Sequence, residues 1–346
     1  MAAYISFQPS DHYSTKLYTG NGSTQSITGV GFQPDWLWIK NRDGTNNHIL
    51  QDAVRGATKS LESDGAGAET TSSTRVTSFD SDGFSIGSAG TNNTNTNNYV
   101  SWNWKAGTSH SGATTGTGTA KTYTASVNTT SGFSITKYTG NGSTGHTIPH
   151  NLGAAPDCLI VKDIDNTNNW NCYFRPLTND YILRLNNNDS KGYETNRWNA
   201  EPTSTVFELG DDAHVNGNDR TYIAYCFAPK KGFSKFGEYK GNGNADGPFI
   251  YTGFRPNWIM IKSHTNASRS WFLFDGANKG YNVTNCVLKP NETVAEDCAT
   301  FLDILSNGFK IRNTNSPFNQ DTSLFIYAAF AEFPFVSSNS KAGVAR

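Results

Sequence analysis

Charge, long apolar runs and cysteine are all scarce in this sequence of 346 residues. Charged residues make up 16% of the chain, and 28 basic residues nearly balance 29 acidic ones. A chain with this balance lacks the strong positive potential that gathers polyanions, so we expect neither nucleic acid nor an anionic membrane as a partner. No stretch approaches the roughly 18 apolar residues of a membrane-spanning helix, and we therefore expect no membrane insertion.

Cysteine is absent before residue 158 and is present in an odd number overall. No Cys-x-x-C pair occurs, which argues against both a disulfide framework and a zinc site. The first ten residues lack the basic and continuous apolar segments of a secretory signal, which predicts synthesis in a reducing cytosol. We therefore expect buried, reduced thiols at all five positions: Cys158, Cys172, Cys226, Cys286 and Cys298.

Glycine, asparagine and aromatic residues are, by contrast, abundant. The chain contains 33 Gly, 8 Trp, 21 Phe and 15 Tyr. Glycine and asparagine favour turns over helices, whereas aromatic residues favour strands. This composition predicts an all-β protein built from many short strands with polar turns between them.

One pattern of residues occurs three times along the chain. Each copy has a tyrosine followed by a Gly-Asn-Gly turn, then a proline that leads an apolar run ending in lysine; the tyrosines are Tyr18, Tyr138 and Tyr239, and the prolines are Pro34, Pro156 and Pro256. Because proline restricts its predecessor to extended conformations, it suits the entrance of a strand. The runs that follow have large residues on both faces, which predicts central strands covered on both sides.

Each copy also ends in an aromatic-rich run of strand length, at 99–104, 222–227 and 325–330. Asp-Gly or Asn-Gly dipeptides before the first and third runs predict hairpins. We therefore predict three tandem antiparallel β-sandwich domains of jelly-roll or lectin-like type, each with its own aromatic core, at residues 1–107, 122–229 and 230–335. Residues 108–121, rich in Gly, Ser and Thr, predict a flexible linker, and residues 336–346 a C-terminal tail.

Several of these motifs together carry a likeness to a known family. They are the Tyr-Thr-Gly-Asn-Gly sequence at Tyr18, Gly-Phe-Gln-Pro at 31–34, Asp-Ala-Val-Arg-Gly at 52–56, Ser-Trp-Asn-Trp-Lys at 101–105 and the ending at 329–335. The chain resembles, over nearly its whole length, repeat-built structural proteins of marine tailed bacteriophages. These are described as virion structural or tail-fibre-like proteins that share a domain of unknown function. The resemblance implies that the protein is located in the virion and contacts other virion proteins.

Catalytic and metal-binding patterns are weak in this sequence. A glycosidase needs two carboxylates across a cleft; six acidic residues qualify by type, but none lies in an acid–base motif: Glu62, Glu69, Asp163, Glu194, Glu201 and Glu208. Asp163 and Asp165 imitate the start of a calcium loop without its glycine and closing glutamate. His146 and His150 have the spacing of a helical zinc pair, but Pro149 removes the helix. We expect no enzyme activity, no metal and no cofactor.

Sugar binding is the functional chemistry that the sequence favours most. β-Sandwiches recognise glycans by stacking a sugar on an aromatic ring among polar side chains. The segment from Trp170 to Trp198 contains Tyr193 and many asparagines, and it is where the three copies differ most. We therefore assign Trp170, Tyr193 and Trp198 to a glycan site, with the alternative that both tryptophans are core residues.

These observations lead to one main functional hypothesis and two alternatives. The main hypothesis is a tail fibre or appendage component, homo-oligomeric and with a trimer favoured, whose loops attach to host-surface glycans through many weak contacts. The first alternative is a purely structural capsid decoration or tail-hub adaptor. The second is a polysaccharide depolymerase.

Overall fold

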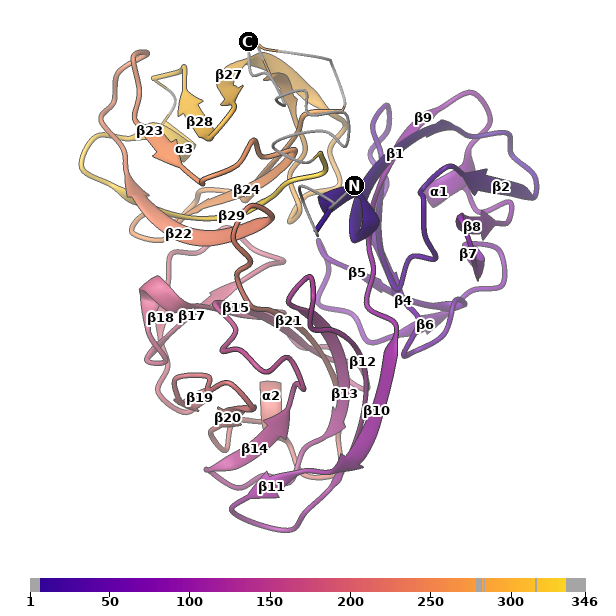
Figure 1. Ribbon diagram of the computed structural model, residues 1–346, viewed down its shortest axis with the longest axis vertical. Helices are drawn as coiled ribbons and strands as arrows, with labels where there is room; N and C mark the ends of the chain where they lie inside the picture. The colour runs from indigo at the N-terminus through magenta and orange to yellow at the C-terminus, as the bar shows by residue number, and fades with distance from the viewer. Residues whose placement is uncertain (1–6, 278–281, 283, 315, 334–346) are drawn as a thin grey trace, which may run out of the picture.

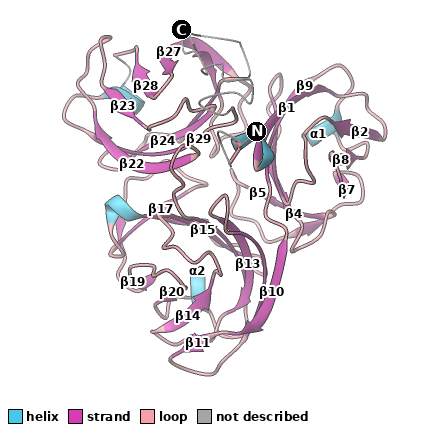
Figure 2. Cartoon of the chain, viewed as in Figure 1, coloured by secondary structure: helices cyan, strands magenta, loops and turns pink. Residues whose placement is uncertain are grey.

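Short antiparallel strands are the main regular structure of the protein, with turns and loops between them, as the composition predicts (Figures 1 and 2). The computed structural model describes residues 7–277, 282, 284–314 and 316–333; the predicted tail at 336–346 lies outside these residues. Within them the strands form six sheets, two for each sequence repeat. The all-β class is therefore confirmed, and no helix in the described part of the chain has the length and apolarity to cross a membrane.

The first repeat has a larger sheet of strand order β1-β9-β3-β4-β5-β6 and a smaller one of order β2-β8-β7. Apolar side chains from both sheets, among them Leu37, Ile39 and Phe84, form its own core. Its elements are η1 (Pro9–Asp11), β1 (Tyr13–Thr19), β2 (Gln25–Thr28), β3 (Trp36–Asn41), β4 (Ile49–Asp52), β5 (Lys59–Glu62), β6 (Thr70–Thr71), β7 (Val76–Asp80), β8 (Gly83–Ile86), α1 (Gly90–Asn93) and β9 (Asn98–Trp104).

The second repeat has sheets of order β10-β12-β13-β21-β15-β16-β17-β18 and β11-β14-β20-β19 around a core that includes Leu159, Val161 and Phe207. Its elements are β10 (Thr108–Ala113), β11 (Thr115–Gly116), β12 (Thr122–Asn128), β13 (Phe133–Thr139), β14 (His146–Pro149), β15 (Cys158–Asp163), β16 (Asn171–Phe174), η2 (Arg175–Leu177), β17 (Tyr181–Arg184), β18 (Gly192–Tyr193), β19 (Trp198–Ala200), β20 (Val206–Leu209), α2 (Ala213–Asn216) and β21 (Thr221–Phe227).

The third repeat has sheets of order β22-β29-β24-β25 and β23-β28-β27-β26 around a core that includes Ile259, Ile261 and Phe309. Its elements are β22 (Ser234–Lys240), β23 (Phe249–Tyr251), β24 (Trp258–Ser263), β25 (Phe272–Asp275), β26 (Thr284–Val287), β27 (Asp297–Leu305), β28 (Gly308–Ile311), α3 (Ser316–Asn319) and β29 (Leu324–Phe330). The three repeats form three lobes around a common centre (Figure 1).

The Gly-Asn-Gly turns have the same anchor in all three repeats. In the first, the buried side chain of Asn93 in α1 accepts a hydrogen bond from the N–H of Asn21 at 2.8 Å. Gly22 takes a φ of 70°, which only glycine adopts without strain. Asn216 and Asn319 hold the other two turns through equivalent hydrogen bonds of 3.0 Å. These turns are therefore structural elements of the fold.

The Pro-led segments form the central strands β3, β15 and β24, each buried along its whole length. Along β3, Leu37 and Ile39 face the core of their own repeat, whereas Trp36 and Trp38 face the opposite way. The same alternation occurs along β15 and β24. The prediction of central strands covered on both sides is therefore confirmed.

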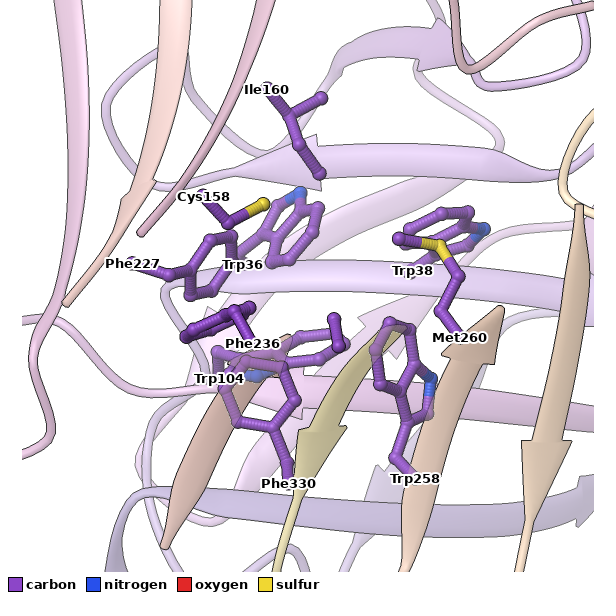
Figure 3. Close-up of a pocket in the computed structure, with 11 residues that line it drawn as sticks. Trp36, Trp38, Trp104, Cys158, Ile160, Phe227, Phe236, Trp258, Met260 and Phe330 are labelled. Atoms are coloured by element: carbon purple, nitrogen blue, oxygen red, sulfur yellow. The ribbon is translucent and has the colours of Figure 1, made fainter. Parts of the chain in front are cut away.

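The second face of these strands packs into one aromatic core that all three repeats share, which we call the shared core (Figure 3). Each repeat contributes the first residue of its central strand and the last residue of its closing strand: Trp36 and Trp104, Cys158 and Phe227, and Trp258 and Phe330. Trp36 stacks on Tyr225 of the second repeat with ring centroids 4.5 Å apart, and Trp104 meets Trp258 of the third at 5.6 Å. A cavity of only about 10 Å³ remains among these side chains.

The shared core adds a second apolar region, common to all three repeats, to the aromatic core that each repeat is expected to bury. Each sandwich does enclose a core between its two sheets. The outer face of the sheet that contains each central strand is also apolar, however, and an exposed aromatic face of that size would be unstable in water. The three faces therefore cover one another, and the repeats form one body.

A loop from each repeat docks onto the next repeat, and the three contacts close a ring. We call these the docking loops; they lie at 62–69, 184–191 and 289–296. Backbone hydrogen bonds tie each loop to its neighbour: Glu69 N to Ile164 O at 2.9 Å, Lys191 N to His264 O at 3.1 Å, and Glu296 N to Arg42 O at 2.9 Å. The chain itself joins the first repeat to the second and the second to the third. The contact between the third and first repeats has no such covalent connection.

Residues 108–121 are not the flexible linker that their composition predicts. β10 pairs along its whole length with β12, and β11 pairs with β14. The hairpin that follows is formed by β12 and β13. Small hydroxylated side chains suit an exposed strand as well as a flexible coil, so composition alone does not separate the two. The second repeat thus begins at residue 108, and β12 and β10 widen its larger sheet beyond β13.

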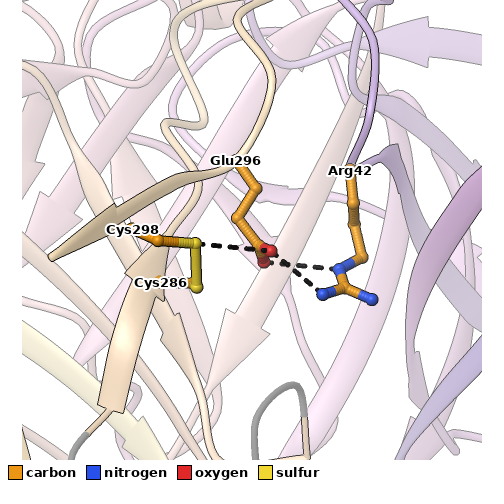
Figure 4. Close-up of a disulfide and its surroundings, with 4 residues drawn as sticks. All are labelled: Arg42, Cys286, Glu296 and Cys298. Carbon is orange, nitrogen blue, oxygen red and sulfur yellow. Dashed lines mark hydrogen bonds and ion pairs between the residues drawn. A yellow bond between two sulfur atoms is a disulfide. The ribbon is translucent and has the colours of Figure 1, made fainter.

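Two of the five cysteines form a disulfide, which corrects the prediction that all five are reduced. Cys286 of β26 lies directly opposite Cys298 of β27, and the two are bonded (Figure 4). The other three, Cys158, Cys172 and Cys226, are buried free thiols as predicted. The sequence separation of 12 residues gives no sign of this pairing, because only the hairpin register places the two strands side by side.

Loss of this disulfide is expected to lower the free energy of unfolding by about 2–4 kcal/mol. The bond closes the base of docking loop 289–296, which joins the two repeats that the chain does not connect. We expect Cys286→Ser/Cys298→Ser to lower the Tm by several degrees and to raise hydrogen exchange in that loop and around Arg42. Reductant should have the same effect on the native protein and none on the variant. Equal melting temperatures with and without reductant would contradict this role.

A pair of buried carboxyl groups lies at the same contact between the third and first repeats. Glu332 accepts a hydrogen bond from the N–H of Thr15 at 3.0 Å and one from the side chain of Asn257. Asp275 accepts one from the indole N–H of Trp102. Burial and, to a smaller extent, the nearby Asp275 carboxyl together raise the pKa of Glu332 to about 7, and burial raises the pKa of Asp275 to about 6.

These raised pKa values predict a stability that falls as the pH rises. The folded protein binds the Glu332 proton more tightly than the unfolded chain, whose pKa is 4.5, so the stabilisation is present below pH 4.5 and is lost as the pH rises through about 7. Between pH 5 and pH 8 the Glu332 carboxyl is expected to lower the free energy of unfolding of the native protein by about 2–3 kcal/mol, and Glu332→Gln should abolish this decrease. Urea unfolding of both proteins across this range measures it, and parallel pH profiles would contradict it.

Candidate functional site

The three residues predicted to form a glycan site do not come together. Trp170 and Trp198 are 0% and 1% exposed, and Tyr193 is 69% exposed. Trp170 lies in the shared core, where its indole N–H donates to Glu62 O at 3.0 Å, and Trp198 lies in the core of the second repeat. A buried indole has no face free for a sugar. The prediction of an aromatic glycan site is therefore wrong, and the alternative, that both tryptophans are core residues, is confirmed.

The six carboxylates weighed as catalytic candidates all make contacts within the fold. Asp163 caps a turn, where its Oδ1 accepts the N–H groups of Asp165 and Asn166 at 3.0 Å each. The partners are Arg75 for Glu62, Arg55 and Lys59 for Glu69, Arg220 for Asp163, Arg184 and Arg197 for Glu194, Arg175 for Glu201, and Asn199 for Glu208. These contacts account for the positions of the carboxylates without a ligand.

The two histidines with metal-like spacing use both ring nitrogens within the protein. His146 is hydrogen-bonded to Asn216 Oδ1 at 2.8 Å and to Thr114 Oγ1 at 2.7 Å. His150 is bonded to Thr203 O at 3.2 Å and accepts the N–H of Leu152 at 3.2 Å. Burial lowers the pKa of His150 to about 4. Both rings therefore serve the structure at neutral pH.

Among the described residues, one group of side chains has metal-ligand chemistry: Cys286, Glu296 and Cys298. The two sulfurs are joined in the disulfide, and the Glu296 carboxylate is paired with Arg42 at 2.9 Å (Figure 4). Thiolate ligands are not present while the disulfide is intact. In this state the group serves to hold the third docking loop against the first repeat.

A large polar groove runs between the first and second repeats. Its volume is about 590 Å³, and it lies where the added strand β10 and its neighbour β12 approach the first repeat. The lining residues are Gln33, Asp35, Ala53, Val54 and Gly107 from the first repeat, and Ser109, His110, Ser111, Thr124, Ala125, Ser126 and Lys137 from the second. We call this the polar groove, and it is our candidate functional site.

The face of the second repeat that lines the polar groove continues the face that forms the shared core. On β13, Ile135 is buried in the shared core, and its cross-strand neighbour Ser126 on β12 lies in the groove. The face therefore changes from apolar at the centre of the molecule to hydroxylated at its edge. Strands β10 and β12 thus extend the sheet beyond the part that the repeats bury together.

The opposite wall places one carboxylate beside the groove. Asp35 is 4% exposed, and its Oδ2 accepts the N–H of Ala106 at 2.8 Å. Burial raises the pKa of Asp35, while the Ala106 hydrogen bond and the charge of Lys105 lower it. The groove also contains one ammonium group, on Lys137. One carboxylate and one ammonium leave the groove close to neutral.

The sequence contains a signal for this site that its composition obscures. The interval from Pro34 to Pro156 is 122 residues, and that from Pro156 to Pro256 is 100. The longer interval contains β10 and β12, which have no counterpart beside β1 or β22 in the other two repeats. A length difference between copies therefore marks the inserted strands, whereas the divergent segment from Trp170 to Trp198 contains a docking loop and two core tryptophans.

Fold and site together define a class of protein: an all-β body of three sandwiches fused around one aromatic core, with a polar groove between two of them. The chain belongs to the family described as domain of unknown function (DUF7483), whose model matches residues 8–334. The match spans all three repeats as one unit. No curated protein matches the chain.

Proposed function

We propose that the protein is a structural component of a virion, in a tail fibre or related appendage, and that it attaches to host-surface glycans. The observation that supports this most is the fusion of three sandwiches by one shared core and a ring of docking loops. Such a body holds its surface features rigidly, so that weak contacts made by many copies add up through multivalency. The likeness of its sequence motifs to repeat-built virion proteins suggests the location.

The disulfide supports a protein that functions outside the cell. Disulfides persist in oxidising surroundings and are rare in a reducing cytosol. A protein made in the host cytosol and released by lysis meets such surroundings only after assembly. Cys286–Cys298 lies at the contact that closes the ring of repeats, where oxidation after release stabilises the assembled body.

A second candidate function, capsid decoration or a tail-hub adaptor, is favoured by the arrangement of the repeats. Three lobes in a ring give one chain an approximate three-fold form (Figure 1). A single copy can then occupy a position of three-fold symmetry that otherwise takes a trimer. In the appendage the proposed form is a homo-oligomer with a trimer favoured, and in both cases the partners are other virion proteins.

Labelling of intact particles tests these proposals. We expect gold-labelled antibody against the folded protein to mark tail structures of purified particles in electron micrographs. Label on the capsid surface would replace the appendage with the decoration role. Label that is absent from particles, while the protein is abundant in the lysate, would overturn both.

A further inference from the structure

We propose that the polar groove between the first and second repeats binds a neutral oligosaccharide. This inference rests on the proposed attachment to surface glycans and names the site and ligand class for it. It replaces the aromatic site at Trp170, Tyr193 and Trp198 with a hydroxylated one.

One wall of the groove presents hydroxyl groups in two regular rows. The register pairs Ser111 with Thr124 and Thr124 with Lys137, so these three stand side by side across β10, β12 and β13. Ser109 and Ser126 are paired in the next row on the same face. Neighbouring strands lie about 4.8 Å apart and alternate residues along a strand about 7 Å apart, which spaces the groups evenly.

Most of these polar groups are available to a ligand. The hydroxyls of Ser109, Ser111 and Thr124 and the ammonium of Lys137 make no hydrogen bond or ion pair with any residue that the structure describes. The side chains of Ser109, Ser111 and Thr124 are exposed, and Lys137 is half-buried. Each hydroxyl both donates and accepts, which matches the hydroxyl groups of a sugar.

The facing wall offers a small apolar surface beside two polar groups. Ala53 and Val54 are half-buried and line the groove, and they suit the C–H face of a sugar ring. Gln33 and the Asp35 carboxylate lie next to them. One carboxylate opposite one ammonium gives no excess of positive charge, so a sulfated or sialylated chain has no cluster of cations to bind.

Both walls are fixed before any ligand arrives. Val54 packs against the shared core. The N–H of Gly107, in the segment that joins the first repeat to the second, donates to Ser126 Oγ at 2.8 Å and so holds this segment against the hydroxylated wall. A preformed groove loses little conformational entropy when it binds. An extended oligosaccharide can therefore lie along the rows without a rearrangement of the repeats.

A binding experiment with matched hydroxyl variants tests the proposal. The probes are neutral hexasaccharides of glucose and galactose, sulfated galactose hexasaccharides and sialylated oligosaccharides, measured by saturation-transfer NMR and calorimetry with the full chain. We expect neutral probes to bind and Ser111→Ala/Thr124→Ala to weaken that binding about tenfold, since each lost hydrogen bond costs about 0.5–1.5 kcal/mol. The matched control, Thr24→Ala/Ser88→Ala, removes two exposed hydroxyls outside the groove and should leave the affinity unchanged.

Each other outcome overturns the inference in a distinguishable way. Binding that survives the groove variant but is lost in Tyr193→Ala would move the site and keep glycan attachment. Preference for sulfated or sialylated probes would overturn the neutral class. Binding of an extended peptide along β10, with no oligosaccharide bound, would make the groove a protein site. Absence of any sugar binding by a protein that labels particles would remove the glycan ligand and leave the virion role intact.

Discussion

Trp36→Ala is expected to lower the free energy of unfolding by about 3–5 kcal/mol and to loosen all three repeats together. The Trp36 side chain is 1% exposed and lies at the centre of the shared core. It packs against Trp104 of its own repeat and against Tyr225 and Phe227 of the second. A cavity at this point removes contacts from both repeats, and the third packs on the same cluster through Trp258 and Phe330.

Denaturant unfolding combined with hydrogen exchange measures this effect. Trp198→Ala is the matched control, because Trp198 is equally buried but lies in the core of the second repeat alone. We expect a similar loss of stability in both variants. Faster exchange should reach all three repeats in Trp36→Ala and remain within the second repeat in Trp198→Ala. Faster exchange confined to the first repeat in Trp36→Ala would show that the repeats are energetically independent.

Arg55→Ala is expected to lower the free energy of unfolding by about 3–5 kcal/mol, because it leaves the buried Asp52 carboxylate without its counter-ion. Arg55 Nε donates to Asp52 Oδ2 at 2.5 Å, and both side chains are at most 1% exposed. The guanidinium also reaches Glu69 at 3.1 Å and the Tyr225 hydroxyl at 3.3 Å. Burial by itself would lower the pKa of Arg55, but Asp52, Tyr225 and Glu69 together raise it, so the guanidinium is charged at all ordinary pH values.

A double-mutant cycle separates this pair from simple loss of packing. In Asp52→Ala/Arg55→Ala no charge is left unpaired, so the loss should be clearly smaller than the sum of the two single variants. Arg75→Ala is the control, since the Arg75–Glu62 pair at 2.8 Å is partly solvated and should contribute less than about 1 kcal/mol. Additive effects at Asp52 and Arg55 would contradict a coupled pair at the contact between the first two repeats.

The contact between repeats shows how small sequence differences change a repeated position. The last residues of β4 and β25 are Asp52 and Asp275, which accept hydrogen bonds from Tyr225 and Trp102 of the neighbouring repeat, whereas β16 ends in Phe174. Phe174 lies 6.1 Å from Trp271 of the third repeat. Two contacts are thus polar at this point and one is apolar. Nothing in the isolated motifs predicts which aromatic group each aspartate meets.

No local sequence pattern predicts the polar groove, for a related reason. Ser111, Thr124 and Lys137 belong to three different strands, and only the register of β10, β12 and β13 makes them neighbours. Gln33 and Ala53 come from the other repeat. Aromatic residues are typical of sugar sites, but most of those in the described part of this protein are buried in its apolar interior.

The sequence by itself determined the three repeats, the all-β class, the Gly-Asn-Gly turns and the Pro-led central strands with two covered faces. These follow from local causes: the restricted backbone of proline, the positive φ of glycine and the alternation of side chains along a strand. Only the tertiary structure decided what covers the second face of each strand, which cysteines meet and where a groove opens. Those outcomes depend on contacts between residues far apart in the chain, where burial of apolar area selects a partner surface that no local pattern encodes.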